Sequence, residues 1–505
     1  MEVVFLTTEA VPFAKTGGLA DVCGALPTRL ANRGHRPVVI MPAFQQIYNA
    51  GLPIETTDIS FAIPINDKIV GARLLRSRLP DSEVPVYFID QPEYFGRPAL
   101  YGDAAGDYVD NCERFAFFCR AALHAITRLD LKVDIVHCND WQTGLVPAYI
   151  RTSFENHPWM AAAATVMTVH NLAYQGQFWH WDMLLTGLGW EHFNSAGMEF
   201  YGHLNLLKTG LVFADSLSTV SPQYAKEIQT AEHGCGLDGV LRARSANLVG
   251  IINGVDGAIW NPATDPHLSQ NYNADSYREG KAANRTSLRA EFGLPDDPNV
   301  PLIGLIGRLA DQKGWDLVIE AMRQELQKGT PMQWVVLGTG DPRYHDALQE
   351  LANAHPDRLG LRLGFSNPLA HKIEAASDIF LMPSRYEPCG LNQLYSLLYG
   401  AVPVVNPTGG LADTVVDTTA ETLAAGTATG FHMREYSVNG LLDALQRAAL
   451  VRWDNQPTWD QIVRRGMRQD WSWRKSAAQY EHLYSETWLR KAARRAAPAP
   501  RPSDF

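Results

Sequence analysis

Short apolar runs alternate with longer helical patterns along this chain, and the alternation sets strong limits on the fold. In the first half the runs rich in strand-forming residues are VVFLTTE, PVVIMP, VPVYFID, DIVHCN, TVMTVHN, SLSTVS and LVGIIN. Longer segments such as NCERFAFFCRAALHAITRL lie between them and carry apolar residues at helical spacing. Such alternation is typical of parallel sheets flanked by helices.

The alternating pattern restarts near residue 255. Residues 252–266, INGVDGAIWNPATDP, are rich in Asn, Gly, Pro and Asp and have the composition of a linker. Five further runs follow it, LIGLIGRL, QWVVLGTG, LRLGFS, DIFLMPS and VPVVNPTG, with helical patterns between them. A length of 505 residues is typical of roughly three domains, but it accommodates two large α/β domains as well. We therefore predict two doubly wound domains, residues 1–254 and 255–473, then a helix over about 474–490. The Ala/Pro-rich, basic residues 491–505 have no means of building a core, so we expect them to be disordered.

Composition and charge exclude several functional classes. Charged residues make up 19% of the chain, and the net charge of −10 is spread without blocks, which disfavours nucleic acids and anionic membranes as partners. The N-terminus has no signal or transit pattern, and no apolar run is long enough to span a bilayer. The scattered cysteines lack C-x-x-C spacing and indicate reduced thiols. We therefore expect a cytoplasmic protein. The cysteines are Cys23, Cys112, Cys119, Cys138, Cys235 and Cys389.

The hexapeptide TGGLAD occurs twice, at residues 16–21 and 408–413. Each copy follows an apolar run and precedes a helical pattern, so each places two glycines where a strand leads into a helix. Ligands bind at the carboxyl ends of strands in open α/β sheets, and glycine lets a ligand approach the backbone. The alternative is a tight turn that needs a positive φ. Two copies in two domains favour a shared ligand-binding cleft.

Basic side chains flank these loops. Lys15 immediately precedes the first TGGLAD copy, and Arg308 and Lys313 bracket another junction, LIGRLADQKGWD. A solvated surface role is the alternative for each single cation. A planar guanidinium together with a compact ammonium suits a diphosphate group.

Polar residues at other strand ends complete the candidate set. Glu387 follows the strand DIFLMPS, where its carboxylate could accept hydrogen bonds from sugar hydroxyls or act as an acid at a helix N-terminus. His170 ends the strand TVMTVH, and Asp140 with Trp141 follows DIVHCN. A structural role is the alternative for the histidine.

Six of these segments together resemble one known family. The resemblance covers residues 1 to about 488 in order and rests on KTGGLADV (15–22), TVHNLAYQG (168–176), INGVD (252–256), GRLADQKG (307–314), PSRYEPCGLNQLYSLLYG (383–400) and TGGLADTV (408–415). They are similar to the bacterial glycogen synthases and plant starch synthases that use ADP-glucose. The resemblance implies a GT-B architecture, an α/β fold in which two Rossmann-like domains face each other across a deep cleft and the final helix crosses back to the first domain.

The resemblance also implies the reaction and its participants. The family transfers glucose from ADP-glucose to the non-reducing end of an α-1,4-glucan such as glycogen, with retention of configuration. It implies no cofactor, no metal, and neither nucleic acid nor membrane as a partner. The chain contains no Asp-x-Asp triplet of the kind that holds a metal in many GT-A enzymes.

Site residues follow from the resemblance position by position. Lys15 would lie beside the donor phosphates and glucose, Arg308 and Lys313 would hold the diphosphate, and Glu387 would contact the glucose ring. The backbone at His170 would face the anomeric carbon. The remaining implied substrate-binding residues are Gly17, Gly18, Asp21, Asp140 in the glucose pocket, Asn253, Phe365 near the adenine, Cys389, Gly390, Gly409 and Gly410.

The cationic residues agree with the chemistry that the resemblance implies. As the glucose C1–O bond breaks, negative charge grows on the leaving diphosphate, and fixed cations stabilise that state. The resemblance also implies a front-face displacement, in which the leaving phosphate helps to deprotonate the 4-hydroxyl of the acceptor. A covalent intermediate is the alternative, but no motif nominates the carboxylate that it would need on the opposite face of the ring.

Some residues depart from the family pattern. Gln142 stands where bacterial members often have histidine, and Asn392 stands where some have threonine. Phe178, Trp179 and Trp181 could form a stacking platform for glucan rings, although we favour core packing for them.

Three rival functions remain. HGCGLDG (233–239) matches the G-x-G-x-x-G dinucleotide fingerprint, with Asp256 about 20 residues on, and would indicate a dehydrogenase. The segment before it, PQYAKEIQTAE, has a helical pattern where the fingerprint requires a strand. The other rivals are a glucan-binding protein without activity and a GT-B enzyme with another nucleotide sugar or linkage.

Overall fold

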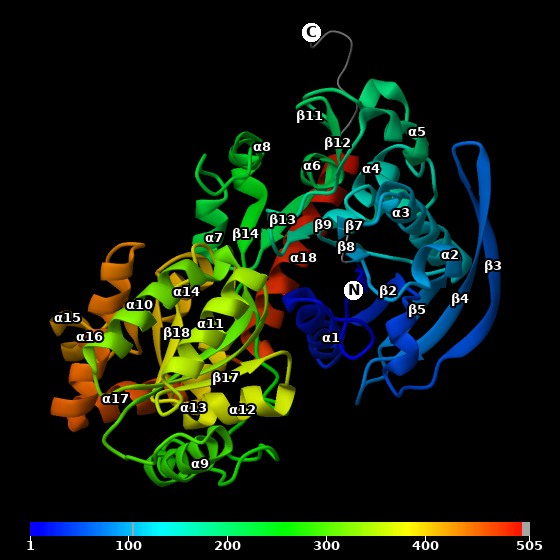
Figure 1. Ribbon diagram of the computed structural model, residues 1–505. Helices are drawn as coiled ribbons and strands as arrows, with labels where there is room; N and C mark the ends of the chain where they lie inside the picture. The colour runs from blue at the N-terminus through cyan, green and yellow to red at the C-terminus, as the bar shows by residue number, and fades with distance from the viewer. Residues whose placement is uncertain (104–105, 497–505) are drawn as a thin grey trace. The chain divides into compact units, whose positions relative to one another are not determined.

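A computed structural model describes residues 1–103 and 106–496 of the chain (Figure 1). The chain divides into two compact units. The first comprises residues 1–253 together with the described part of residues 473–505, and the second comprises residues 254–472.

A large sheet forms the centre of the first unit, in the order β14-β13-β9-β8-β1-β2-β5-β4-β3. The strands from β14 to β5 run parallel, and β4 and β3 add an antiparallel hairpin at one edge (Figure 1). The strand bounds are β1 (Glu2–Leu6), β2 (Arg36–Pro42), β3 (Glu55–Ile65), β4 (Lys68–Arg78), β5 (Pro85–Asp90), β8 (Ile135–Asn139), β9 (Ala164–Val169), β13 (Ser216–Thr219) and β14 (Leu248–Gly250). The short strands are β6 (Gly102–Asp103), β7 (Gly106–Asp107), β10 (Gln177–Phe178), β11 (Glu199–Phe200) and β12 (His203–Asn205).

Burial along these strands follows their sequence patterns. All residues of β8 and β9 are buried, because a parallel strand covered by helices on both faces needs apolar residues throughout. The hairpin β3–β4 instead alternates exposed and less exposed residues, as expected for a strand pair with one solvated face. The helices of this unit are α1 (Gly18–Ala31), α2 (Pro92–Phe95), α3 (Asn111–Arg128), α4 (Val146–Arg151), α5 (Met183–Thr186), α6 (Leu206–Phe213), α7 (Pro222–Glu227), α8 (Asp238–Ala243) and α18 (Trp473–Ala496).

The second unit is built on a parallel sheet with the order β17-β16-β15-β18-β19-β20. Its strands are β15 (Leu302–Leu309), β16 (Gln333–Gly340), β17 (Leu359–Leu363), β18 (Ile379–Met382), β19 (Val402–Val405) and β20 (Phe431–His432). Its helices are α9 (Tyr277–Phe292), α10 (Trp315–Lys328), α11 (Pro342–Ala354), α12 (Asn367–Ala376), α13 (Asn392–Tyr399), α14 (Gly409–Thr414), α15 (Ala420–Ala424), α16 (Val438–Asp454) and α17 (Gln456–Met467).

Strand order confirms that both units are doubly wound. Numbered along the chain, the second sheet has the order 3-2-1-4-5-6, which is the Rossmann order. The parallel strands of the first sheet follow the same order with one further strand at the end. Each sheet therefore has a switch point where the chain direction across the sheet reverses, between β1 and β8 in the first unit and between β15 and β18 in the second.

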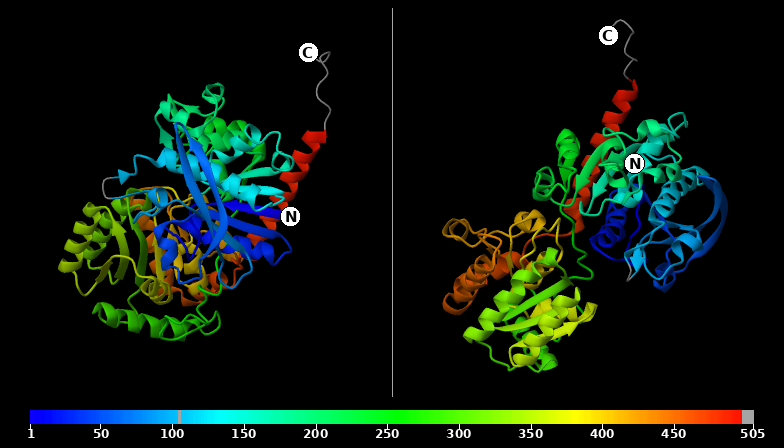
Figure 2. Two further views of the ribbon diagram at one scale, coloured as in Figure 1. Left: turned by 90° about the vertical axis from the view of Figure 1, so that its right-hand side faces the viewer. Right: turned by 45° about the horizontal axis from the view of Figure 1, so that its top comes forward.

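The final helix, α18, packs on the core of the first unit (Figure 2). Trp473, Tyr480 and Tyr484 are buried there, and the Tyr484 hydroxyl lies 2.8 Å from Nδ1 of His137 on β8. No helix within the described residues is both long and apolar enough to cross a membrane.

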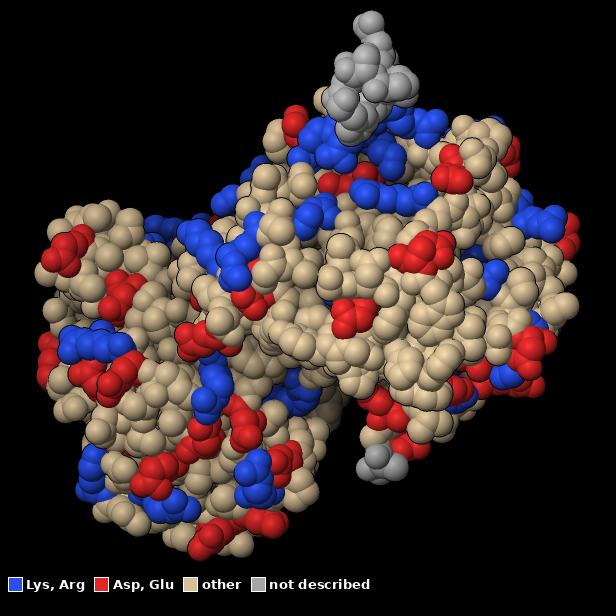
Figure 3. All heavy atoms as spheres, turned by 90° about the horizontal axis from the view of Figure 1, so that it is seen from above, with Lys and Arg blue, Asp and Glu red and all other residues tan. Residues whose placement is uncertain are grey.

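The expectation that residues 491–505 are disordered is wrong for residues 491–496, which continue α18. These residues are Lys, Ala and Arg, which are strong helix formers, and Lys491 donates to Oδ2 of Asp215 at 3.2 Å. Lys and Arg side chains gather where the helix ends (Figure 3), and Arg151 also pairs with Asp215. Residues 497–505 lie outside the described residues.

Candidate active site

Most of the predicted site residues lie in loops at the carboxyl ends of parallel strands. In the first unit Lys15 follows β1, Asp140 follows β8 and His170 follows β9. In the second unit Arg308 lies at the end of β15, and Glu387 lies in the loop after β18. Both sets flank the switch point of their own sheet, which is where open α/β sheets bind ligands.

The first TGGLAD loop is held by a carboxylate that sequence reasoning missed. Glu9 is 4% exposed, and its Oε2 accepts hydrogen bonds from the backbone N–H groups of Thr16 at 2.5 Å and Gly17 at 3.0 Å. Its Oε1 accepts from the Thr16 hydroxyl at 2.5 Å and the Tyr101 hydroxyl at 2.8 Å. The available signal was an acidic residue directly after a buried strand, in VVFLTTE. Glu9 therefore fixes the loop that carries Lys15.

Gly17 and Gly18 of this loop face open space. A Cβ added at either position would meet no atom within 4 Å, and neither residue has a positive φ. The tight-turn alternative is therefore wrong for the first copy. Since packing within the protein does not demand glycine here, the loop is suited to close approach by a ligand.

Lys15 and Asp21 form an ion pair at the start of α1. The Lys15 ammonium donates to Oδ1 of Asp21 at 2.7 Å and to Oδ2 at 2.9 Å. The Lys15 side chain is 51% exposed, so it remains accessible to a ligand. The geometry gives Asp21 the role of orienting this cation.

Asp140 and His170 meet beside the switch point of the first sheet. The backbone N–H of His170 donates to Oδ1 of Asp140 at 2.7 Å. Nε2 of the His170 imidazole lies 3.0 Å from Oδ1 of Asn139. Burial raises the pKa of Asp140 to about 7, although hydrogen bonds from the backbone at His170 and Asn171 oppose the rise. Burial also lowers the pKa of His170 to about 3, so its imidazole is neutral at pH 7.

Asp140 also has a strained backbone. Its φ of 55° and ψ of −176° fall in a region that is normally occupied by glycine alone. Such strain costs about 1–3 kcal/mol and is concentrated at functional sites. Together with the perturbed pKa, the strain supports a functional role for this carboxyl group.

Two further polar residues of the first unit carry buried oxygens. Oδ1 of Asn253 and Oε1 of Gln142 have no hydrogen-bond partner among the described residues. Asn253 is a predicted substrate-binding residue, and Gln142 is the residue that replaces the family's usual histidine. A ligand hydroxyl or water could satisfy such oxygens.

Of the cations of the second unit, Arg308 lies at the end of β15 and Lys313 lies in the following segment, which packs against the loop after β18. The Lys313 ammonium donates to Oε2 of Glu387 at 2.6 Å, and the Ser384 hydroxyl donates to the same oxygen at 3.0 Å. The side chain of Glu387 is buried, whereas Arg308 is exposed and its Nη2 contacts Oε1 of Gln312 at 3.1 Å. Gln312 in turn donates to the Tyr386 carbonyl at 3.2 Å, beside Glu387. Arg308, Lys313 and Glu387 therefore belong to one cluster, in which Gln312 connects Arg308 to the loop of Glu387.

Glycine is required for this contact between loops. Gly314 has a φ of +75°, and a Cβ there would lie 2.1 Å from the carbonyl oxygen of Pro383. The close approach also allows the Arg385 N–H to donate to the Gln312 carbonyl at 2.9 Å.

The second TGGLAD copy has a different role from the first. Gly409 has a φ of +46°, and a Cβ there would lie 2.0 Å from the carbonyl oxygen of Glu387. A Cβ on Gly410 would lie 1.9 Å from the carbonyl oxygen of Cys389, and the Gly410 N–H donates to the Glu387 carbonyl at 3.0 Å. These glycines therefore support the loop of Glu387, Cys389 and Gly390 by close backbone packing.

Phe365, after β17, is 88% exposed. Singly exposed apolar side chains are common on protein surfaces, so the exposure alone does not mark a site. The ring is nevertheless accessible to a flat ligand group that could stack on it.

The preference for core packing of the aromatic segment is wrong for two of its three residues. Trp179 is 60% exposed and Trp181 is 49% exposed, while Phe178 packs against the core and lies 5.8 Å from the Trp141 ring. Aromatic and polar residues alternate in this segment, and that pattern alone did not predict which of the aromatic side chains are exposed to solvent.

The dinucleotide fingerprint at 233–239 lies in the wrong context. It follows α7 and a turn, and α8 begins within it at Asp238. The fingerprint requires a strand before its first glycine, so the dehydrogenase reading lacks its structural support.

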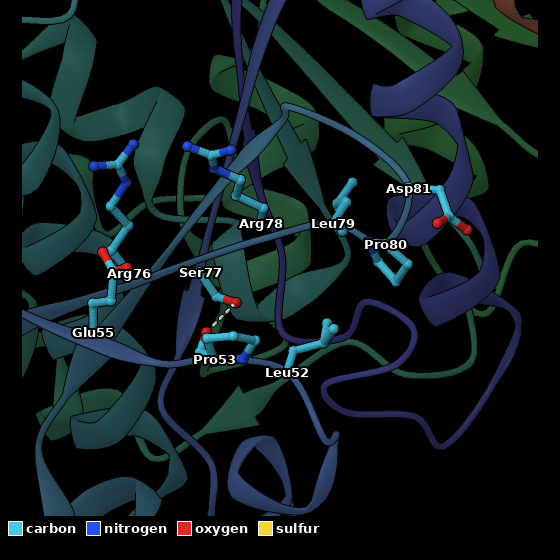
Figure 4. A pocket seen from close by; sticks show the side chains of 9 residues that line it. All are labelled: Leu52, Pro53, Glu55, Arg76, Ser77, Arg78, Leu79, Pro80 and Asp81. Carbon is cyan, nitrogen blue, oxygen red and sulfur yellow. Dashed lines mark hydrogen bonds between the residues drawn. The ribbon is translucent and has the colours of Figure 1, made fainter.

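A hollow of about 450 Å³ lies at the β3–β4 edge of the first unit (Figure 4). Leu52, Pro53, Leu79 and Pro80 supply much of its lining, and the Ser77 hydroxyl donates to the Pro53 carbonyl at 2.7 Å. None of the predicted site residues lines it. No group of three or more His, Cys, Asp or Glu residues in the described parts of the chain is arranged to hold a metal ion.

Comparison with known proteins agrees with this geometry. A family model described as the starch synthase catalytic domain matches residues 2–243, and one described as glycosyl transferases group 1 matches residues 300–448. Glycogen synthase of Rhodopirellula baltica is 57% identical over 496 residues, which cover 96% of this chain and 98% of that protein. Glycogen synthase of Syntrophotalea carbinolica is 48% identical over 486 residues, with the same shares of the two chains.

Solved structures give the same result. The catalytic domain of starch synthase IV from Arabidopsis thaliana, bound to ADP and acarbose, has a TM-score of 0.89 at 33% identity and covers 97% of this chain and 99% of its own. Sucrose-phosphate synthase from Thermosynechococcus elongatus has a TM-score of 0.59 at 17% identity over the same shares, which shows a shared fold.

These findings confirm the predicted GT-B fold class and the predicted enzyme class. The chain is a glycosyltransferase of glycogen biosynthesis that elongates a glucan with glucose from a nucleotide sugar. It belongs to the glycogen synthase and starch synthase family.

Proposed function

We propose that the donor of this enzyme is ADP-glucose and that it transfers glucose, with retention of configuration, to the non-reducing end of an α-1,4-glucan. The observation that carries the proposal is the cluster of Arg308, Lys313 and Glu387 beside the switch point of the second sheet. Binding of ADP by the related starch synthase IV supports the identity of the nucleotide.

The cluster suits a sugar diphosphate because it combines charge and hydrogen-bonding capacity. The exposed guanidinium of Arg308 can bind two phosphate oxygens, and Lys313 supplies a second positive charge. Glu387, fixed by Lys313 and Ser384, can accept hydrogen bonds from glucose hydroxyls. Phe365 offers an exposed ring on which adenine can stack.

The proposed reaction breaks the bond between C1 of glucose and the β-phosphate oxygen. The electron pair of that bond passes to the phosphate, where the cations stabilise the developing charge. The 4-hydroxyl oxygen of the acceptor forms the new bond to C1 on the same face, and its proton passes to a phosphate oxygen of the leaving ADP. Thus retention requires no protein nucleophile.

Residues of the first unit would act on the sugar. The backbone at His170 would face C1, and the neutral imidazole adds no positive charge beside a developing oxocarbenium ion. Asp140 and Asn253 would bind glucose hydroxyls, and Lys15 with Gly17 and Gly18 would border the phosphates.

We further propose that the reaction needs no metal or other cofactor and takes place in the cytoplasm. Arginine and lysine can neutralise the diphosphate in place of a metal. The free state of all six cysteines supports a reducing compartment.

The test is the initial rate with ADP-glucose and with UDP-glucose at equal concentration, with glycogen as acceptor, for the wild type, Lys15→Ala and Lys68→Ala. Lys68 is the matched control because it is also an exposed lysine of the first unit in an ion pair, with Glu113. We expect a strong preference for ADP-glucose and a large loss only in Lys15→Ala. NMR of the product should show the α-anomer.

Other results would change the proposal in defined ways. Activity with UDP-glucose alone would overturn the donor assignment. Transfer from neither donor would favour a glucan-binding protein, and an equal loss in Lys68→Ala would remove the specific role of Lys15.

A further inference from the structure

Three exposed tryptophans gather on the segment of the first unit that follows His170. Trp179, Trp181 and Trp190 are 60%, 49% and 43% exposed. The ring centroids of Trp179 and Trp181 are 6.3 Å apart, and those of Trp181 and Trp190 are 5.4 Å apart. We call these three residues the tryptophan platform.

These rings are far more exposed than the tryptophans of the two cores. Trp315, Trp334, Trp459 and Trp473 are each at most 3% exposed. Contiguous exposed apolar surface on a folded protein commonly marks a binding site. The platform is therefore a candidate for a second binding site of the enzyme.

The platform is held by ordered structure beneath it. Trp181 lies in a short 3₁₀ helix, His180–Asp182, and α5 follows directly with Met183 and Thr186 buried. The Tyr149 hydroxyl donates to the Thr186 carbonyl at 2.6 Å. Trp190 begins a second 3₁₀ helix and packs against Phe193, with centroids 5.5 Å apart. Rings that are positioned in advance lose little entropy on binding a ligand.

The charges around the platform indicate the chemistry of its ligand. Residues 171–207 contain no lysine or arginine, whereas Asp182 and Glu191 lie next to the platform tryptophans in sequence. Outside this segment, the Arg120 guanidinium lies beside Gly187 and donates to the Pro64 carbonyl. The surface formed by residues 171–207 themselves disfavours phosphates, nucleic acids and anionic lipids. It suits a neutral ligand that presents apolar C–H faces to the indole rings and donates hydroxyl hydrogens to carboxylates. Pyranose rings have these two properties.

We propose that the tryptophan platform binds a glucan chain at a position separate from the residues that hold the sugar nucleotide. This inference rests on the proposed function only in taking an α-1,4-glucan as the ligand. A polymer bound at the platform and at the reacting end has a raised effective concentration at the second contact. Consequently the platform increases affinity for glycogen, whereas a short oligosaccharide gains little from it.

The experiment compares the wild type with the double variant Trp179→Ala/Trp181→Ala. The matched control is Trp488→Ala, because Trp488 is a 39% exposed tryptophan on α18 of the same unit. Binding is measured as retardation in native gels containing glycogen, without a nucleotide sugar. KM is then measured for glycogen, for a short malto-oligosaccharide and for the donor.

The expected result is a loss of glycogen affinity of about tenfold, equivalent to about 1.4 kcal/mol, in the double variant alone. Its KM for glycogen should rise, while kcat and the KM values for the donor and the short acceptor stay at wild-type values. Because the gel assay needs no donor, it gives this result whether or not ADP-glucose is the true donor.

Two results would overturn the proposal. Unchanged retardation of the double variant would show that glycogen does not bind the platform. A change in oligomeric state with unchanged glycogen binding, seen by light scattering, would assign the tryptophans to a contact between copies of the chain.

Discussion

The ammonium of Lys313 lies 2.6 Å from Oε2 of Glu387, so a buried carboxylate binds one of the cations predicted to hold the donor diphosphate. The Ser384 hydroxyl donates to the same oxygen, so two groups hold Oε2 of Glu387 in place. This pairing orients both side chains before the donor binds. Electrostatic stabilisation of a transition state is strongest when the charged groups need not reorganise.

Replacing Lys313 by alanine should lower kcat by about 10²–10³-fold, the usual cost of removing one such group. The variant also leaves the Glu387 carboxylate buried without a cation, so its thermal stability should fall. Lys372→Ala is the matched control, since Lys372 pairs with Glu291 at 2.8 Å on the surface of the same unit. Steady-state kinetics and thermal unfolding of both variants provide the test. Near-wild-type kcat in Lys313→Ala would contradict a catalytic role.

The two TGGLAD copies should respond differently to the same substitution. Gly410→Ala places a Cβ against the Cys389 carbonyl and should destabilise the fold, whereas Gly17→Ala meets no protein atom and should unfold like the wild type. Gly17→Ala should nevertheless lower kcat/KM, by about tenfold, because its methyl group lies where a ligand approaches the backbone. Thermal unfolding and donor kinetics measure the two effects.

Gly71→Ala is the control for Gly17→Ala. Gly71 lies on β4 and also has open space around it without a positive φ, but it is not a predicted site residue. Wild-type kinetics in both Gly17→Ala and Gly71→Ala would show that the open space at Gly17 serves no ligand.

The contrast between these glycines shows how far the sequence could predict the site. Motif position and strand order place most candidate residues at strand ends, because a parallel strand, its loop and the next helix are local in sequence. The same six letters nevertheless surround an open loop at Gly17 and a tightly packed one at Gly410. The difference arises because the loop at Cys389 packs directly against Gly410, whereas Gly17 has open space around it.

Long-range partners explain the other differences. The position of Glu9 after a buried strand was a signal in the sequence, but the hydrogen bond that Tyr101, 92 residues later, donates to its carboxylate was not. The exposure of Trp179 likewise depends on what packs against its segment. The helical state of residues 491–496 instead follows from their own helix propensity, together with the contact of Lys491 with Asp215. The residue types within one segment do not specify which distant segments pack against it.

Removal of the Glu9 carboxylate should impair the donor site without any direct contact to the donor. In Glu9→Ala the N–H groups of Thr16 and Gly17 lose their acceptor, so the loop bearing Lys15 loses its fixed position. We expect kcat/KM for the donor to fall by about tenfold or more, since small misplacements of catalytic groups are costly.

Glu9→Gln distinguishes positioning from charge. Its amide oxygen can still accept from both N–H groups, and its amide N–H₂ can donate to the hydroxyl oxygens of Thr16 and Tyr101 after these rotate. Most of the activity lost in Glu9→Ala should therefore return in Glu9→Gln, with an unchanged pH profile. An equal loss in both variants would contradict the positioning role and indicate that the negative charge itself is needed.

The raised pKa of Asp140 predicts a pH-dependent cost to stability. Because the pKa is about 7 in the folded protein and about 3.8 in the unfolded chain, the folded state binds more protons between these values. Stability contributed by this group is therefore full below about pH 4 and declines as pH rises towards 7.

The variant Asp140→Asn keeps an oxygen that can accept the backbone N–H of His170, but it does not ionise. Its free energy of unfolding relative to the wild type should thus improve by about 3 kcal/mol between pH 5 and pH 8. Urea unfolding of the ligand-free proteins at these pH values tests this, with the exposed Asp130→Asn as the control, for which we expect no such change. A pH-independent difference between Asp140→Asn and the wild type would mean that Asp140 is already ionised at pH 5, and that it meets the donor glucose as a carboxylate throughout this range.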